Sequence, residues 1–298
     1  MLSDLSLIKY PKKCSNDSKK VINKEKSAIQ IESILKRITN NNQEMMNRFY
    51  NNINSVNIKA RPFSIPRNVD ARYINITNTI EYRWKKALNH ELFHLASSIY
   101  DSEEEIEFSG FRIAYLNKET KLPIYNYGVG INEGFTHYLV RKYSNGKNVY
   151  KRQVDIATLL SRIIGEERMI ELYFTDGLKG LCIELQKYMD EKEIISFINN
   201  MDKIVGILDN TFEIDEIMVE IYDFIISLFS KKNQERIKNG TIRYDDAILD
   251  FDWLKDYILI GKHRVRRVLK SKKAKSKMIL KILDDSKKNF IDNNKTRN

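Results

Sequence analysis

Apolar side chains recur every three or four residues through much of this chain, the spacing that gathers them on one face of a helix. Residues 19–51 contain no glycine or proline and carry this pattern, which predicts a long helix that can break at the three asparagines of residues 40–42. The same spacing over residues 80–100 predicts a second helix. The first third of the chain is therefore expected to hold two main helices.

Between and after these helices the pattern changes to that of strands. Residues 69–79 alternate with period two and are rich in β-branched and aromatic side chains, which predicts a strand. Residues 111–116 and 122–127 flank a polar turn and predict a β-hairpin. Asn132, a residue type favoured at helix N-termini, then predicts a helix over residues 132–143.

The rest of the chain is predicted to be helical. No proline follows Pro123, and periodic apolar patterns continue through residues 154–229. Together, the patterns predict an α+β fold with a small mixed α/β subdomain over residues 1–143 and a mostly helical subdomain over residues 144–261. A basic tail over residues 262–298 follows.

The charge of the protein is concentrated in that tail. The 298 residues include 51 Lys and Arg against 40 Asp and Glu, a formal net charge of +11. The last 37 residues, from Lys262 to Asn298, hold 14 of the basic and 3 of the acidic residues, which leaves 37 of each sign in the rest of the chain. Residues 1–261, the body of the chain, therefore carry no formal net charge.

The apolar residues of the tail lie near helical spacing among lysines and arginines, which predicts a basic amphipathic helix. Such a helix can bind an anionic partner, whether a membrane surface, a nucleic acid or an acidic protein. It can equally be a last helix that packs on the body and exposes its lysines to solvent. The sequence leaves both interpretations open.

Several classes of protein do not fit this sequence. The longest apolar stretch, near residues 221–229, is interrupted by Asp223 and is far shorter than the ~20 residues of a membrane-spanning helix. Asp4 lies where a signal peptide carries positive charge. Cys14 and Cys182 are the only cysteines, too few for a disulfide framework or a zinc site built on thiolates. We therefore expect a cytoplasmic protein without a transmembrane segment.

The strongest chemical signal is a His-Glu-Leu-Phe-His motif within the predicted helix at residues 80–100. At ~100° per residue, His90 and His94 lie one turn apart on the same face, so both imidazoles can reach one metal ion. Glu91 lies beside that face, where it can contact a metal-bound water. The alternative is that both histidines are ordinary, partly buried side chains, as a short motif can arise by chance.

A second motif offers a third metal ligand. A catalytic zinc usually has three protein ligands and keeps its fourth position for water. Glu133 lies 39 residues after His94, at the start of the next predicted helix. The sequence thus predicts one Zn²⁺ per chain, held by His90, His94 and Glu133.

Together, the two motifs resemble those of the gluzincin clan of zinc metallopeptidases, the thermolysin-like group. The similarity covers roughly residues 69–143, and residues 132–139, Asn-Glu-Gly-Phe-Thr-His-Tyr-Leu, are similar to the glutamate helix of poorly characterised bacterial HExxH proteins. The resemblance implies a zincin-like subdomain with a strand beside the cleft and a helical lower half. It also implies hydrolysis of a peptide or protein substrate by a zinc-activated water, with Glu91 as general base.

The chain departs from the family's pattern at one position. In thermolysin-like enzymes an acidic residue one turn after the glutamate ligand orients the first histidine, and here that position is His137. His137 can approach the metal, stabilise the oxyanion or be an ordinary histidine near the site. The acceptor that orients His90 then has to come from elsewhere, and nearby acidic residues are candidates: Asp70, Asp101, Glu103, Glu104 and Glu105.

The sequence also leaves open which residue donates the hydrogen bond that stabilises the oxyanion. Its candidates are the polar side chains on and near the glutamate helix: Tyr127, His137, Tyr138, Arg141 and Tyr143. With 16 tyrosines in the chain, any single tyrosine is more often a packing residue than a catalytic one.

Two functions of other classes are compatible with the sequence. A basic protein that binds nucleic acid or an anionic surface can carry a structural, non-catalytic zinc, although such a site has no need for Glu91. A metalloprotease-like protein can also bind a peptide without cutting it.

Overall fold

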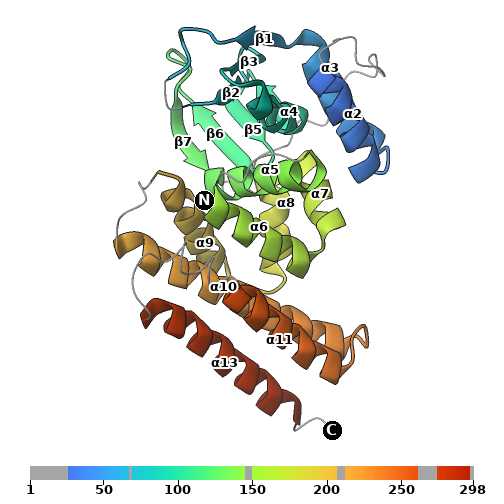
Figure 1. Cartoon of the computed structure of the whole chain (residues 1–298), viewed down its shortest axis with the longest axis vertical. Coiled ribbons are helices and arrows are strands. Elements are labelled where there is room, and N and C mark those ends of the chain that lie inside the picture. Colours follow the sequence, from blue (N-terminus) through green and yellow to red (C-terminus); the bar gives the residue numbers. More distant parts are fainter. Residues whose placement is uncertain (1–25, 67–68, 145–149, 207–211, 261–273, 296–298) are drawn as a thin grey trace. The chain divides into compact units, whose positions relative to one another are not determined.

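The computed structural model describes residues 26–66, 69–144, 150–206, 212–260 and 274–295 (Figure 1). About 68% of the structure is helical, and two small sheets supply its strands. This mixture of helices and strands agrees with the α+β prediction at that level. The chain divides into two compact units, Met1–Glu184 and Leu185–Asn298. None of the helices described has both the length and the apolar character that crossing a membrane requires.

Two helices, α2 (Lys26–Ile38) and α3 (Gln43–Ser55), begin the described part of the first unit. Between them Asn40 and Asn41 have φ angles of 51° and 56°, a left-handed conformation that Asn adopts more readily than most residues. Asn42 then caps α3, because its side-chain oxygen accepts hydrogen bonds from two backbone amides of the first turn. The break predicted at the three asparagines is confirmed.

The first sheet has the strand order β1-β3-β2. Its strands are β1 (Asn57–Ala60), β2 (Ala71–Ile74) and β3 (Thr79–Tyr82). β1 runs parallel to β3, and β2 runs antiparallel to it. The single strand predicted over residues 69–79 is wrong, because a turn from Asn75 to Asn78 divides it, and Asn78 has a φ of 43°. The β-branched residues inside the turn hide it from a pattern-based prediction.

The second sheet is an antiparallel meander whose strands follow one another along the chain. They are β4 (Ser98–Asp101), β5 (Ile106–Ser109), β6 (Arg112–Leu116) and β7 (Pro123–Tyr127). The predicted hairpin corresponds to β6 and β7 and is confirmed. The acidic run after β4 forms the turn to β5, in which the Asp101 carboxylate accepts hydrogen bonds from two backbone amides.

The His-Glu-Leu-Phe-His motif lies on α4 (Leu88–Ser97), which follows the short 3-10 helix η1 (Lys85–Ala87). α4 is shorter than the helix predicted over residues 80–100, because β3 and β4 draw the two ends of that segment into sheets. Leu92 and Leu95 are fully buried where α4 packs among α2, α3 and α5. Burial of this apolar face fixes the rotation of α4 about its axis.

The second motif lies on α5 (Val129–Tyr143), which begins before Asn132. The N-cap role predicted for Asn132 is therefore wrong, and the residue that precedes the helix is Gly128, with a φ of 75°. A Cβ atom at Gly128 would lie 2.0 Å from the carbonyl oxygen of Phe111, so a larger residue does not fit there. The earlier start places Asn132 inside the helix, where it is buried.

Further helices follow in the first unit: α6 (Lys151–Ile164), α7 (Glu166–Phe174) and α8 (Gly177–Gln186), which ends just beyond it. α6 approaches α5 so closely that a Cβ atom on Gly134 would lie 2.4 Å from the carbonyl oxygen of Gln153. The unit boundary thus differs from the subdomain boundary predicted after residue 143, because this contact joins α6 to the α/β part of the chain.

The described helices of the second unit are α9 (Glu191–Gly206), α10 (Phe212–Lys238), α11 (Tyr244–Ile260) and α13 (Ala274–Lys295). α10 packs against α9 with the rings of Phe197 and Phe224 stacked at 4.3 Å. This unit agrees with the helical array predicted for the second half of the chain.

α13 is the described part of the predicted basic tail; residues 262–273 and 296–298 of the tail lie outside the described residues. α13 packs on α10 and α11 and buries Ile279, Leu283 and Phe290. Its Lys287 pairs with Asp252 of α11 at 2.5 Å. The described part of the tail therefore has the arrangement of a packed last helix.

Candidate metal centre

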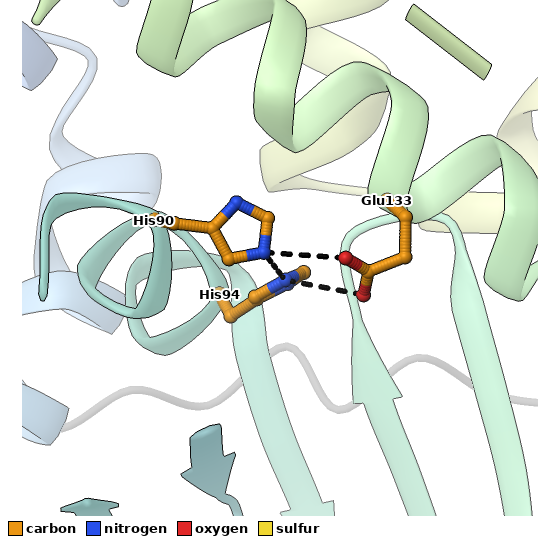
Figure 2. Close-up of side chains that lie close together, drawn as sticks. All are labelled: His90, His94 and Glu133. Carbon is orange, nitrogen blue, oxygen red and sulfur yellow. Dashed lines mark hydrogen bonds and ion pairs between the residues drawn. The ribbon is translucent and has the colours of Figure 1, made fainter. Parts of the chain in front are cut away.

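Two histidines on α4 bring their imidazoles together. His90 and His94 lie one helical turn apart, and their Nε2 atoms are 2.8 Å from each other. The rings meet edge to face with centroids 4.5 Å apart. Figure 2 shows both Nε2 atoms directed away from the axis of α4 and toward Glu133. The shared face expected from the i, i+4 spacing is present.

Glu133 on α5 completes the cluster from the opposite side. Its Oε2 atom lies 3.2 Å from Nε2 of His90, and its Oε1 atom lies 3.4 Å from Nε2 of His94 (Figure 2). The packing of α5 against α4 and the close approach of α6 at Gly134 hold the carboxylate there. The three residues predicted as metal ligands are thus neighbours in space.

The cluster fits a small divalent cation. One candidate ligand atom from each of the three residues lies within 4.8 Å of the others. Tetrahedral zinc with bonds of 2.0–2.1 Å separates its ligand atoms by about 3.3 Å. The observed separations of 2.8, 3.2 and 3.4 Å bracket that value. Two imidazoles and one carboxylate form a donor set that suits zinc and several other transition metals.

The carboxylate of Glu133 and the two imidazoles are close enough to influence one another's protonation. Burial raises the pKa of Glu133, but His94 and His90 outweigh it and hold the pKa well below its usual range. Burial lowers the pKa of His90, and the nearby carboxylates of Glu133 and Glu91 outweigh it and raise the pKa. The carboxylate therefore needs a neighbouring positive charge, which either a proton or a metal ion can supply.

Glu91 faces the same cavity without belonging to the cluster. Its side chain is buried, and burial raises its pKa against the opposing effect of His90 and His94. A backbone hydrogen bond from Tyr73 of β2 anchors the carboxylate. A carboxylate whose pKa is raised by burial binds a proton more readily than a free glutamate, which suits a group that accepts and returns protons.

A polar cavity of about 190 Å³ opens beside the cluster. Its wall comes from β2 and the turn after it, α4, the second sheet, the start of α5 and the residue before α6: Ala71, Arg72, Tyr73, Asn75, His90, Glu91, His94, Ser98, Ser109, Arg112, Asn132, Glu133 and Tyr150. A second cavity of about 240 Å³ shares His90, Glu91 and Tyr150 with the first. Both cavities expose Glu91 to any molecule bound beside the cluster.

Asn132 supports the site in a way that the sequence did not reveal. Its Nδ2 atom lies 3.3 Å from Nδ1 of His94, while its Oδ1 atom accepts a hydrogen bond from the backbone amide of Phe111 at 3.1 Å. The residue thus links α4, α5 and the start of β6. The residue type predicts a helix cap at Asn132. Because α5 begins at Val129 instead, Asn132 lies inside the helix with its side chain toward His94.

His90 has no such support among the described residues, where its buried Nδ1 atom lacks a hydrogen-bond partner. The acidic candidates are engaged or placed elsewhere. Asp101 caps the β4–β5 turn that contains Glu103 and Glu104. Glu105 pairs with Lys121 at 2.5 Å. Asp70 lines the second cavity but does not bond to Nδ1 of His90, which has no partner among the described residues.

His137 lies against His90, with ring centroids 4.1 Å apart. Burial, reinforced by the charge of His90, lowers the pKa of His137 to about 3, so its imidazole is neutral. It lines the second cavity and lies outside the three-residue cluster. Tyr138 lines neither cavity: its ring stacks on Phe135, and its hydroxyl accepts a hydrogen bond from Lys142.

The other proposed oxyanion donors also lie away from both cavities. The Tyr143 hydroxyl donates to Glu166 at 2.6 Å, Tyr127 stacks on Tyr125, and Arg141 is exposed. Tyr150, which the sequence did not single out, lines both cavities. It belongs to neither motif, so only tertiary packing brings it to the site.

Comparison with protein-family models, with curated proteins and with solved structures finds no match for this chain.

Proposed function

We propose that this protein is a zinc-dependent metallopeptidase of the gluzincin type, in which His90, His94 and Glu133 hold one zinc ion and Glu91 is the general base. The observation that carries the proposal is the convergence of the three ligand side chains beside a buried glutamate and a cavity. The contacts of α4 with β2 and β3 and the helices that follow α5 support the proposal of a zincin-like subdomain. The cytoplasmic location stays a prediction.

Each side chain has a defined task in this proposal. Bound zinc would supply a Lewis acid that lowers the pKa of a bound water toward ~7 and polarises the substrate carbonyl. Glu91 takes the proton of the attacking water and returns it to the leaving amine. Asn132 positions His94 from behind. The buried faces of α4 and α5 pack against each other and hold these side chains in place before substrate binds.

Tyr150 is the best placed donor for the oxyanion. Burial, together with the negative charges of Glu133 and Glu91, raises its pKa to about 12, so the hydroxyl keeps its proton. A protonated hydroxyl beside the cluster can donate a hydrogen bond to negative charge that develops on the substrate oxygen. His137, whose ring centroid lies 5.0 Å from that of Tyr150, packs against this side chain.

The alternative, a basic protein with a structural zinc that binds nucleic acid or an anionic surface, gains no support from α13, which packs within the second unit. It also assigns no role to Glu91 or to the cavity. A protein that binds peptides without cutting them has the same site but yields no product at any metal loading.

Cleavage of a peptide library separates these possibilities. The zinc-loaded wild type, Glu91→Gln and Glu119→Gln are compared, and Glu119 is a matched control because it lies exposed in the β6–β7 turn. The proposal predicts cleavage by the wild type and by Glu119→Gln and its loss in Glu91→Gln with zinc retained. Equal cleavage by Glu91→Gln, or no product from the zinc-loaded wild type, would contradict it.

A further inference from the structure

Two arginines lie in the wall of the cavity beside the cluster, and they differ in how tightly an acidic side chain holds them. The Arg72 guanidinium binds the Glu81 carboxylate through both Nε and Nη2, at 2.8 and 2.7 Å, and its Nη2 also donates to the Ser64 carbonyl. Its charge is therefore paired inside the first sheet. Arg112, at the start of β6, has no contact of this kind among its described partners.

Acidic groups hold Arg112 less tightly than they hold Arg72. Its Nε atom donates to the neutral amide oxygen of Asn126 at 2.8 Å. Its nearest carboxylate in the described structure is Glu107, whose Oε2 atom lies 3.5 Å from Nη2, beyond a normal hydrogen bond. Burial raises the pKa of Glu107 against the opposing charge of Arg112, and the two side chains form a long ion pair.

The position of Arg112 suits a ligand rather than a structural pair. Its side chain is 25% exposed and lines the same cavity as His90, His94 and Glu133. Asn126 holds the guanidinium by Nε, and Glu107 approaches Nη2 only from 3.5 Å, so the terminal N–H groups can still bind a carboxylate in the cavity. A cavity of about 190 Å³ accommodates a group of that size next to a reacting bond.

We propose that Arg112 binds a carboxylate of the substrate, so that the protein prefers peptides with an acidic group close to the cleaved bond. The inference rests on the proposed function, because it names the substrate class of the same site. The carboxylate can be an acidic side chain or the free C-terminus of the peptide. Asn126 then acts as a positioning residue that orients the arginine.

Matched peptides test the preference and identify the source of the carboxylate. The substrates are acetylated pentapeptide amides with Glu or Gln at each position in turn, together with the corresponding free acids. The zinc-loaded wild type is expected to favour one acidic form by roughly 10- to 100-fold in kcat/KM, mainly through KM. A preference for Glu over Gln assigns a side chain, and a preference for acid over amide assigns the C-terminus.

Two arginine variants connect the preference to the cavity. Arg112→Gln is expected to bring the ratio of acidic to neutral kcat/KM close to one, and Arg112→Lys to restore part of it. Arg141→Gln is the matched control, because Arg141 is exposed and lines neither cavity, and it is expected to keep the wild-type ratio. Cleavage without an acidic preference, or a preference that survives Arg112→Gln, would overturn the inference and leave the proposed function intact.

Calorimetry separates failure of this inference from failure of the proposed function. The same peptides are titrated into zinc-loaded Glu91→Gln, with and without Arg112→Gln. If the wild type cleaves nothing but the acidic peptides bind in an Arg112-dependent way, the hydrolytic function fails and the carboxylate site stands. Equal binding of acidic and neutral peptides refutes the carboxylate site whether or not the wild type is active.

Discussion

The first unit buries charged side chains, whereas the second keeps nearly all of its described charges at the surface. In the first unit Glu81, Glu91, His94 and Glu107 are all buried. Among the described residues of the second unit, Asp215 is the one buried charged side chain. Burying a charge costs free energy unless it is paired, so buried charges mark either strong pairs or functional groups. The buried charges therefore indicate that the candidate functional groups lie in the first unit.

The largest expected effect comes from forcing α5 away from α6. Gly134→Val would place side-chain atoms against the backbone of Gln153, where even a Cβ lies only 2.4 Å from the carbonyl oxygen. We expect the free energy of unfolding to fall by about 3 kcal/mol. Zinc affinity should fall with it, since Glu133 is the preceding residue. Urea unfolding with unchanged stability would contradict the close packing described for these helices.

A second variant tests the support that Asn132 gives to His94. Asn132→Leu keeps the approximate volume but removes the amide, and we expect zinc affinity to fall by roughly 10- to 100-fold, measured by chelator competition. Asn47→Leu is the control, because Asn47 is buried but bonds to Gln43 on α3, away from the cluster. If Asn132→Leu lowers Tm without changing zinc affinity, Asn132 serves only the backbone of Phe111.

A third variant uses pH to probe a partly buried pair of the first unit, Glu81 and Arg72. Burial raises the pKa of Glu81, but hydrogen bonds from Ser64 and Arg72 outweigh it, so its folded pKa lies below 4.5. A lowered carboxyl pKa stabilises the fold above pH 4.5, and this contribution disappears as the pH falls through the folded value. Glu81→Gln should therefore cost about 1 kcal/mol at neutral pH and less in acid. A pH-independent difference in urea unfolding would argue against this pair.

The smallest effect is expected for a surface pair of the second unit. Asp252→Asn removes the partner of Lys287, but the Asp252 side chain is 51% exposed. Solvent screens such pairs, so we expect stability to change by no more than about 0.5 kcal/mol. A loss as large as that of Glu81→Gln would remove the contrast between the two units.

The local parts of the fold were predictable because their signals lie within a few residues. The break at Asn40 and Asn41 and the β6–β7 hairpin follow from turn residues. The i, i+4 spacing likewise fixes the relation between His90 and His94 once a helix forms. The strand over residues 69–79 failed because tertiary pairing with β1 takes up Thr79–Tyr82 and leaves Asn75–Asn78 as a turn.

The rest of the site depends on contacts between distant segments. Glu133 could be chosen from its motif, but its distance to the histidines depends on how α5 packs on α4. The residue type of Asn132 predicts a helix cap, whereas α5 begins at Val129 and places Asn132 inside the helix. Arg112 and Tyr150 belong to neither sequence motif. Only the packing of distant segments brings them to the cavity, so the sequence pattern could not predict them.

The most direct test of the central claim is the metal content of three proteins prepared in parallel: the wild type, Glu133→Ala and Glu91→Gln. Elemental analysis after exhaustive dialysis should find one zinc per chain in the wild type and in Glu91→Gln, because the proposed ligands do not include Glu91. Glu133→Ala should retain only a small fraction of it. A wild type without transition metal, or a Glu133→Ala variant that holds zinc as tightly as the wild type, would contradict the three-residue metal site.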